Sequence, residues 1–249
     1  MTDSTTTSTA TLDTSTRKPL WVSIIVTLGA ALVLSGVFQS CIGQVFAVPS
    51  GSMEPTLNGC SDCNNDKIYV NRTAFWSSSP QPGDVIVFKG PKGWETGMEN
   101  YRPDNTFYSR TLDALSYVGL AAPRNNTFVK RVIATSGQTV SCQAGDPAIM
   151  VDGKATNTEF LNHHTNPELS LASGSSDCGG RYFGPIKVPE GSVFVVGDNR
   201  THSLDSRSHI SDGLSGSVPL DNVVGRVEAV IWPIPHISTI KEQEMFLID

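Results

Sequence analysis

The chain has 249 residues, of which 39% are hydrophobic, so it is long enough for one or two domains with a buried core. Its 24 acidic residues outnumber its 18 basic ones, and the net charge of −6 without a basic cluster excludes a nucleic-acid-binding protein. The 22 glycines and 15 prolines indicate a turn-rich, mostly β protein.

The N-terminal region predicts a tail followed by a membrane anchor. Residues 1–19 are rich in Thr, Ser and Asp and end near a basic pair, which predicts a disordered cytoplasmic tail. Residues 20–38 carry no charge and could cross roughly 30 Å of hydrocarbon, so we expect one transmembrane helix over 20–40 and an extracytoplasmic domain over 41–249. A secretory signal cut after Ala47 is the alternative, which the length of the apolar run disfavours.

The stretch Val48–Leu57 follows the apolar run and reads VPSGSMEPTL. Two prolines stiffen its flanks, and Gly51 allows a tight bend between the hydroxyls of Ser50 and Ser52. A hydroxyl held on such a bend could be a nucleophile. The same residues could also form a plain linker, and the stretch alone does not decide between these interpretations.

The five cysteines are consistent with an extracytoplasmic domain. Cys60 and Cys63 could form half of a zinc site, but no second pair follows at zinc-like spacing. Disulfides are favoured outside the cell. We therefore expect a small loop closed by Cys60–Cys63 and a longer one closed by Cys142–Cys178, with Cys41 free or facing lipid. A zinc site is therefore not expected at these cysteines.

The segments between these cysteines predict strands and one helix. Short apolar runs over 67–71 and 84–89 are bounded by turns and predict strands. Residues 104–120 combine a helix cap with apolar residues on one face, which predicts a short amphipathic helix. Packing on the domain is the default for this helix, and contact with the membrane surface is the alternative.

Residues 126–140 predict a strand that carries Lys130. Alternation along the strand places Lys130 between Phe128 and Val132 on one face. In an apolar setting the charged form of a lysine is disfavoured, so its pKa falls and the neutral amine can accept a proton. The alternative is a lysine whose stem reaches out to water.

The last part of the chain predicts an insertion, two more strands and a charged loop. Residues 141–192 form the insertion closed by the second disulfide, and strands are expected over 193–196 and 223–232. A sharp turn at Gly197 precedes a loop in which charges of both signs surround a hydroxyl. This loop could be a purely structural salt-bridged segment or the scaffold that positions a catalytic lysine.

Two mechanisms could activate Ser52. In the first, His202 and Asp205 complete a Ser-His-Asp arrangement, although both lie close together on one loop. In the second, Lys130 removes the Ser52 proton directly. Lys130 is the lysine with the most strongly apolar strand around it, which favours the second mechanism.

Together these stretches resemble the type I signal peptidase family, membrane-bound serine proteases that remove signal peptides from exported proteins. Residues 49–57 are similar to the nucleophile box, and residues 82–88, 129–138 and 197–207 are similar to the remaining boxes in the family's order. The C-x-x-C pair, the long segment before the lysine and the spacing of the last two cysteines resemble actinobacterial members. After Arg207 the chain departs from the pattern with a longer surface loop.

The resemblance implies a role for each matching residue. Ser52 is the implied nucleophile and Lys130 the general base, with an oxyanion hole formed by the Ser52 N–H and the Ser50 hydroxyl. Ser203 is the hydroxyl that orients the lysine. The resemblance further implies that Asp205 pairs with two arginines of the site, Arg131 and Arg207. It also implies a supporting loop under the active site, formed by Gly197, Asp198, Asn199 and Arg200.

The same resemblance implies a fold and a substrate. The fold is mostly β, with coiled antiparallel sheets behind one transmembrane helix. The substrates are signal peptides of exported preproteins, bound as an extended strand and cut after small-x-small sequences. The implied location is the bacterial plasma membrane, near the secretion translocon, without a cofactor.

Two competing functions remain at this stage. One is a membrane-anchored surface domain without activity, in which Ser52 and Lys130 are structural. The other is a Ser-Lys protease that cuts itself, which the membrane anchor disfavours.

Overall fold

The computed structural model describes residues 19–60, 65–94, 110–111, 127–161, 178, 182–240 and 243–246. For residues 37–41 only the backbone is described. The expected disordered tail up to residue 18, Cys63 and most of the expected helix over 104–120 lie outside the described residues.

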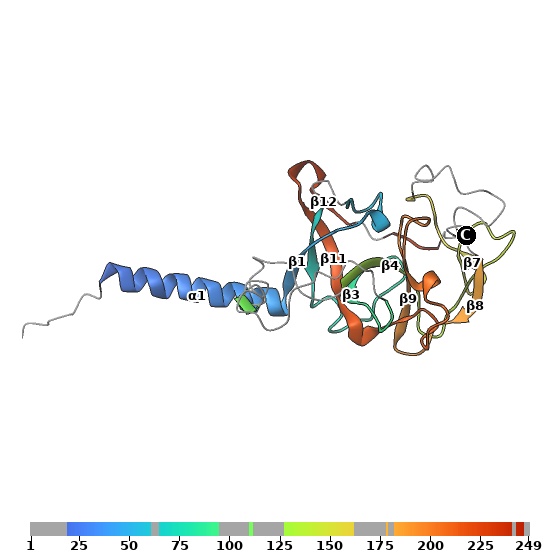
Figure 1. The fold of residues 1–249 in the computed structure, drawn as a ribbon, viewed down its shortest axis with the longest axis horizontal. Coiled ribbons are helices and arrows are strands. Elements are labelled where there is room, and N and C mark those ends of the chain that lie inside the picture. The colour runs from blue at the N-terminus through green and yellow to red at the C-terminus, as the bar shows by residue number, and fades with distance from the viewer. Residues whose placement is uncertain are drawn as a thin grey trace, which may run out of the picture.

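A long helix precedes a domain of two antiparallel sheets (Figure 1). The eight-stranded sheet has the order β1-β2-β11-β3-β4-β9-β10, and β12 pairs with β11. Its strands are β1 (Gly43–Ala47), β2 (Lys67–Asn71), β3 (Val85–Lys89), β4 (Thr127–Thr135), β9 (Ser192–Val196), β10 (Val218–Pro219), β11 (Val223–Trp232) and β12 (Ser238–Thr239). The four-stranded sheet has the order β7-β6-β5-β8. Its strands are β5 (Thr139–Cys142), β6 (Met150–Val151), β7 (Lys154–Ala155) and β8 (Phe183–Lys187). The expected mostly β, antiparallel fold is confirmed.

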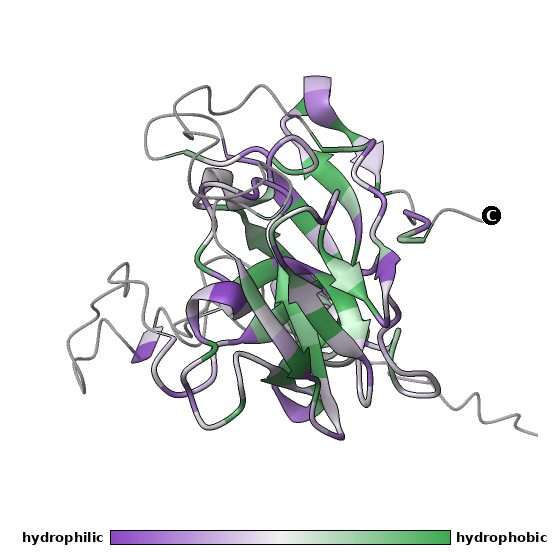
Figure 2. Ribbon diagram, turned by 90° about the vertical axis from the view of Figure 1, so that its right-hand side faces the viewer, coloured by the Kyte–Doolittle hydropathy of each residue, from purple (hydrophilic) through white to green (hydrophobic). Residues whose placement is uncertain are grey.

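The central strands of the large sheet are apolar on both faces. All five residues of β9 are buried, and four of the five in β3 are. Such continuous apolar runs form strands that are covered on both sides. Figure 2 shows these strands as the most hydrophobic part of the domain, surrounded by more polar connections. Register shifts between β11 and β2, β11 and β3, and β4 and β9 bend the sheet, because an irregular residue increases the local twist.

The core of the domain lies directly behind the Val48–Leu57 stretch. Val48, Met53 and Leu57 are buried in one cluster with Val85 and Val227 from the large sheet. Three apolar side chains therefore fix this stretch to the sheet at both ends and in its middle. Burying each such side chain contributes roughly 1.5–3 kcal/mol, so the stretch is a firmly packed element and not a loose linker.

The smaller sheet forms a lobe that packs against the large sheet, and its buried residues share one core cluster with Ile133, Phe194 and Val196 of β4 and β9. Cys142 at the end of β5 forms a disulfide with Cys178, as expected from the sequence. The C-terminal segment crosses this lobe, where the Met245 carbonyl accepts from the Asn157 N–H at 2.7 Å and Met245 is buried. Cys63, the expected partner of Cys60, lies outside the described residues, so the Cys60–Cys63 disulfide stays a prediction.

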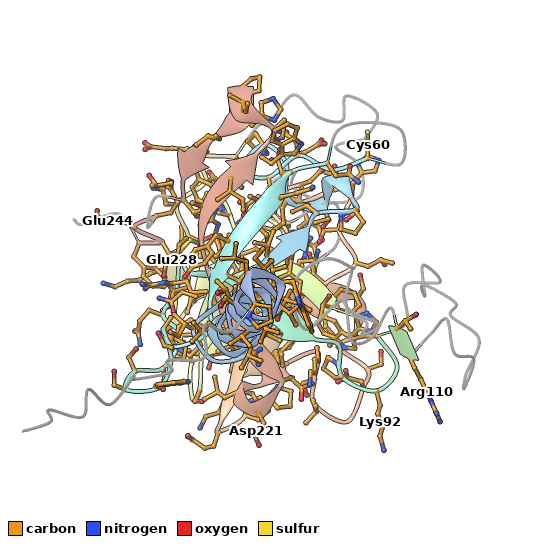
Figure 3. The ribbon with its side chains drawn as sticks, turned by 90° about the vertical axis from the view of Figure 1, so that its left-hand side faces the viewer. Cys60, Lys92, Arg110, Asp221, Glu228 and Glu244 are labelled. Carbon is orange, nitrogen blue, oxygen red and sulfur yellow. A yellow bond between two sulfur atoms is a disulfide. The ribbon has the colours of Figure 1, made fainter. Side chains whose placement is uncertain are left out.

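Helix α1 (Leu20–Cys41) extends away from the β domain (Figure 1). Its apolar side chains are exposed, for example Leu20 at 82% and Trp21 at 63%. Figure 3 views the helix nearly end-on, with Lys92, Asp221 and Glu228 around the rim of the domain. Among the residues that the structure describes, no helix meets the length and apolar character needed to cross a membrane, so the expected transmembrane anchor is not confirmed.

Candidate active site

Ser52 lies on a single 3-10 turn, η1 (Gly51–Met53), between β1 and the buried Leu57. The loop after β9 holds this turn by hydrogen bonds to the backbone carbonyls of the turn. The Asn199 N–H donates to the Ser52 carbonyl at 3.1 Å, and Asn199 Nδ2 donates to the Gly51 carbonyl at 3.1 Å. The position of the Ser52 hydroxyl is therefore set from two sides, by the apolar core and by the loop.

Lys130 on β4 lies beside Ser52. Its Nζ donates to Ser52 Oγ at 2.6 Å and to the Val129 carbonyl at 3.0 Å, and the side chain is almost fully buried. Burial lowers the pKa of Lys130 from 10.5 to about 8, while Asp205 and Asp198 oppose this shift and Arg207 adds to it. Desolvation disfavours the charged amine more than the carboxylates favour it. The pair can therefore exchange a proton close to neutral pH.

Two further hydroxyls lie near this pair. Ser50 Oγ donates to Ser52 Oγ at 3.4 Å, which places it on the same side of the turn. The Ser203 hydroxyl is buried and does not hydrogen-bond to Lys130, and its side chain helps to lower the pKa of Asp205. A side chain at Gly197 would collide with the Ser203 hydroxyl and the Ser52 carbonyl. The absence of a side chain at Gly197 thus lets the loop lie close to the turn.

A buried ion pair lies beneath the turn. Arg131 binds Asp198 with both ends of its guanidinium, at 2.8 Å from Nε and 2.7 Å from Nη2. Its Nη1 donates to the Gly83 carbonyl at 2.7 Å, and Thr56 Oγ1 donates to Asp198 at 2.6 Å. The ring of Phe160 faces the guanidinium at 4.6 Å. This pair joins β4, the nucleophile stretch and the loop after β9.

A second buried ion pair lies within the loop itself. Arg207 binds Asp205 at 2.9 Å and 2.7 Å, and the Gly197 N–H donates to the same carboxylate at 2.9 Å. Although burial raises the pKa of Asp205, Arg207 and the Gly197 N–H hold it below its ordinary value. Arg131 pairs with Asp198 and not, as expected, with Asp205.

The loop histidine does not take part in this arrangement. His202 is exposed and lies 3.2 Å from Thr201 Oγ1. Arg200, by contrast, is buried, and burial together with Arg207 lowers its pKa to about 10. The described residues therefore bring together a serine and a lysine, with the predicted acidic and basic residues packed behind them.

Comparisons with known proteins identify the family of the chain. Residues 21–232 match the family described as signal peptidase, peptidase S26. The chain belongs to this family. A probable signal peptidase I of Mycobacterium leprae is 43% identical over 230 residues, which cover 87% of this chain and 78% of the relative. Signal peptidase I of Mycobacterium tuberculosis is 43% identical over 209 residues, which cover 82% and 69%. A crystal structure of a signal peptidase I from Enterococcus faecalis is 22% identical with a TM-score of 0.33, covering 60% of this chain and 97% of that one.

As a member of the signal peptidase family, the chain is a serine endopeptidase. The mycobacterial relatives confirm the expected likeness to actinobacterial members.

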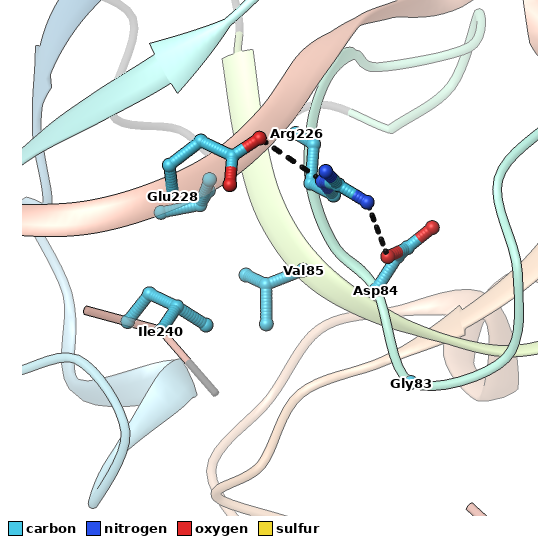
Figure 4. A pocket seen from close by; sticks show the side chains of 7 residues that line it. Gly83, Asp84, Val85, Arg226, Glu228 and Ile240 are labelled. Carbon is cyan, nitrogen blue, oxygen red and sulfur yellow. Dashed lines mark hydrogen bonds and ion pairs between the residues drawn. The ribbon is translucent and has the colours of Figure 1, made fainter. Parts of the chain in front are cut away.

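A pocket of about 280 Å³ lies at the edge of the same network (Figure 4). Arg226 stands between Asp84, at 3.6 Å, and Glu228, at 3.1 Å, and Ile240 closes one side. The backbone of Gly83 connects this pocket to Arg131.

Among the described residues, no group of three or more His, Cys, Asp or Glu side chains could hold a metal ion.

Several contacts of the site were not predicted from the sequence. The Thr56 hydroxyl and the Gly83 carbonyl both bind the Arg131–Asp198 pair, and both lie in motifs that had been singled out for other residues. Phe160 and the Cys178 carbonyl come from the insertion. No local pattern marks these two contacts, because they depend on how the insertion packs against the large sheet.

Proposed function

We propose that this chain is a signal peptidase I that removes signal peptides from exported preproteins with a Ser52–Lys130 dyad. The observation that carries the proposal is the 2.6 Å contact between Lys130 Nζ and Ser52 Oγ, together with the lowered pKa of Lys130. A buried lysine with a pKa of about 8 is a suitable general base, and the distance is within hydrogen-bond range.

The reaction proceeds through an acyl-enzyme. Neutral Lys130 takes the Ser52 proton as Oγ attacks the scissile carbonyl carbon, and the Ser52 N–H and the Ser50 hydroxyl donate to the developing oxyanion. The C–N bond then breaks, and the protonated Lys130 gives its proton to the leaving amine. Water, deprotonated by Lys130, attacks the ester, releases the signal peptide as a carboxylate and restores Ser52.

The substrate binds as an added strand beside Lys130. On one side, residues 127–131 of β4 pair with β3, whereas β9 pairs only with residues 131–135 on the other side. Among the described residues, β9 therefore does not extend along residues 128–130 of β4, the part of the strand that carries Lys130 next to Ser52. A strand added there is read mainly through its backbone, which fits an enzyme that accepts many sequences. Small residues one and three positions before the cut then face the domain, which explains a small-x-small preference.

The rate should rise with pH through the pKa of Lys130. Only the neutral amine is a base, so kcat/KM for cleavage of a preprotein by the full chain in detergent should increase up to about pH 8 and level off above it. Ser52→Ala supplies the background rate at each pH. A rate that is independent of pH from 6 to 10 with the fold intact, or full activity of Ser52→Ala, would contradict the proposal.

The same proposal places the enzyme at the bacterial plasma membrane. The supporting observation is α1, where apolar side chains such as Leu20, Trp21 and Ile24 are exposed without covering the domain. A helix that is apolar all round is stable when it is surrounded by lipid or protein. We infer a single-pass anchor with a cytoplasmic N-terminus and an extracytoplasmic domain, close to the translocon that delivers the substrate.

Membrane attachment should depend on the apolar surface of α1. The full chain should float with phospholipid vesicles in a density gradient, and Leu28→Asp with Leu32→Asp should reduce floating strongly, because a charge in hydrocarbon costs about 2.5–3.5 kcal/mol. Lys154→Asp, an exposed change in β7, should leave floating unchanged. An unmodified chain that remains in the aqueous fraction would refute the anchor.

A further inference from the structure

The insertion contributes two contacts to the charged residues behind the dyad. One is the Cys178 carbonyl, which accepts from Arg207 Nη1 at 3.0 Å. The other is the Phe160 ring, which faces the Arg131 guanidinium at 4.6 Å. Asp205 binds Nε and Nη2 of Arg207 and leaves Nη1 to the Cys178 carbonyl. Asp198 binds the edge of the Arg131 guanidinium and leaves its face to the Phe160 ring. Neither belongs to the Ser52–Lys130 chemistry itself.

The Cys178 contact is held in place by a covalent bond. Cys178 is buried and bonded to Cys142, at the end of β5, and β5 pairs with β8 and β6. A backbone carbonyl on a tethered, buried residue is a fixed acceptor. A guanidinium with five N–H donors in one plane is oriented by acceptors on both sides. Asp205 and Cys178 together therefore determine where the charge of Arg207 lies.

The position of that charge matters for Lys130. The charged groups that act on Lys130 are Asp205 and Asp198, which favour its protonated form, and Arg207, which opposes it. If Arg207 moves outward, Asp205 acts on Lys130 with less compensation. Lys130 then holds its proton more strongly and is a base over a narrower pH range.

We propose that the disulfide-closed insertion is a positioning element of the active site, in which the Cys178 carbonyl and the Phe160 ring hold Arg207 and Arg131 in place. This inference rests on the proposed Ser52–Lys130 mechanism. It assigns the Cys142–Cys178 disulfide a role in activity in addition to its role in stability. Neither Cys178 nor Phe160 is a catalytic residue, because both act through an arginine.

The test compares three variants of the full chain in detergent. Cys142→Ala with Cys178→Ala removes the tether without leaving a lone thiol, Phe160→Leu removes the ring with the disulfide intact, and Val151→Ala loosens the core of the same lobe without touching either arginine. The unmodified chain and Ser52→Ala are assayed first. If these two cleave equally, the proposed function itself fails, and the inference falls with it.

The expected result is a change in the pH profile. The double cysteine variant should move the kinetic pKa of kcat/KM upward by about half a unit or more, which corresponds to about threefold lower activity at neutral pH that recovers near pH 10. Phe160→Leu should lower kcat with KM unchanged. Val151→Ala should keep the pH profile of the unmodified chain. An unshifted pH profile in the double cysteine variant would overturn the proposal, and so would the same shift in Val151→Ala. If the double cysteine variant does not fold, an unchanged kcat in Phe160→Leu overturns the proposal.

Discussion

Replacing Lys130 with methionine should abolish cleavage while leaving the fold as stable as before or more stable. Removing a general base costs on the order of 10²–10⁴ in rate, and here the base lies 2.6 Å from the nucleophile. The methionine fills a similar volume without a charge. Activity on a preprotein and urea denaturation of the same sample measure both effects.

The stability of this variant follows from the sign of the pKa shift. The pKa of Lys130 is about 8 in the folded chain, against 10.5 as its ordinary value, so the unfolded chain binds more protons between these values. Stability should therefore rise as pH increases from 8 to 10.5, and below pH 8 the lysine should cost about 3 kcal/mol. Lys130→Met should remove that dependence.

Lys154→Met is the matched control, because Lys154 is an exposed lysine on β7. It should change neither the cleavage rate nor the pH dependence of unfolding. Substantial activity in Lys130→Met would exclude Lys130 as the base, and a large loss of stability would indicate that the lysine has a structural role.

Breaking the Arg131–Asp198 pair should destabilise the domain and reduce activity together. Asp198→Asn leaves a guanidinium with 1% exposure without its counter-charge, and losing one partner of a buried pair costs about 3–5 kcal/mol. The activity should fall because Asn199, the next residue, holds the carbonyls of Gly51 and Ser52. Urea denaturation and kcat of the remaining folded enzyme report the two effects separately.

Two further variants complete this experiment. Thr56→Val removes two hydrogen bonds to the pair, the one donated to Asp198 and the one accepted from Arg131, and should cost about 2 kcal/mol. Arg131→Met with Asp198→Leu replaces both charges by apolar groups and should recover much of the lost stability, since a buried ion pair is rarely better than an apolar contact. If Asp198→Asn is no less stable than Thr56→Val, the pair does not support the turn.

The sequence was informative where a property belongs to a single segment. Alternation along 126–140 placed Lys130 between apolar neighbours and left open whether its stem reaches water, and its 4% exposure supports the desolvated lysine. The apolar runs at 84–89 and 193–196 predicted buried strands because they are continuous and bounded by turns, and β3 and β9 are buried. The redox compartment predicted the Cys142–Cys178 disulfide.

The sequence was less informative where two segments meet. Both Asp198 and Asp205 lie on the loop after β9, and only the packing of this loop against β4 decides which of them faces Arg131. The same holds for Phe160 and Cys178, which reach the arginines from a lobe with its own sheet. Such contacts depend on tertiary geometry, which neither residue spacing nor alternation reports.

The central claim is that Lys130 is the base that activates Ser52, and a direct titration of Lys130 tests it best. Lysine labelled at Cε and Nζ would be followed by nuclear magnetic resonance in the full chain, with Lys130→Met identifying the signal. The account predicts that Lys130 titrates at about 8 and that kcat/KM rises with the same midpoint. A Lys130 signal that titrates near 10.5 while the rate rises at a different pH would contradict it.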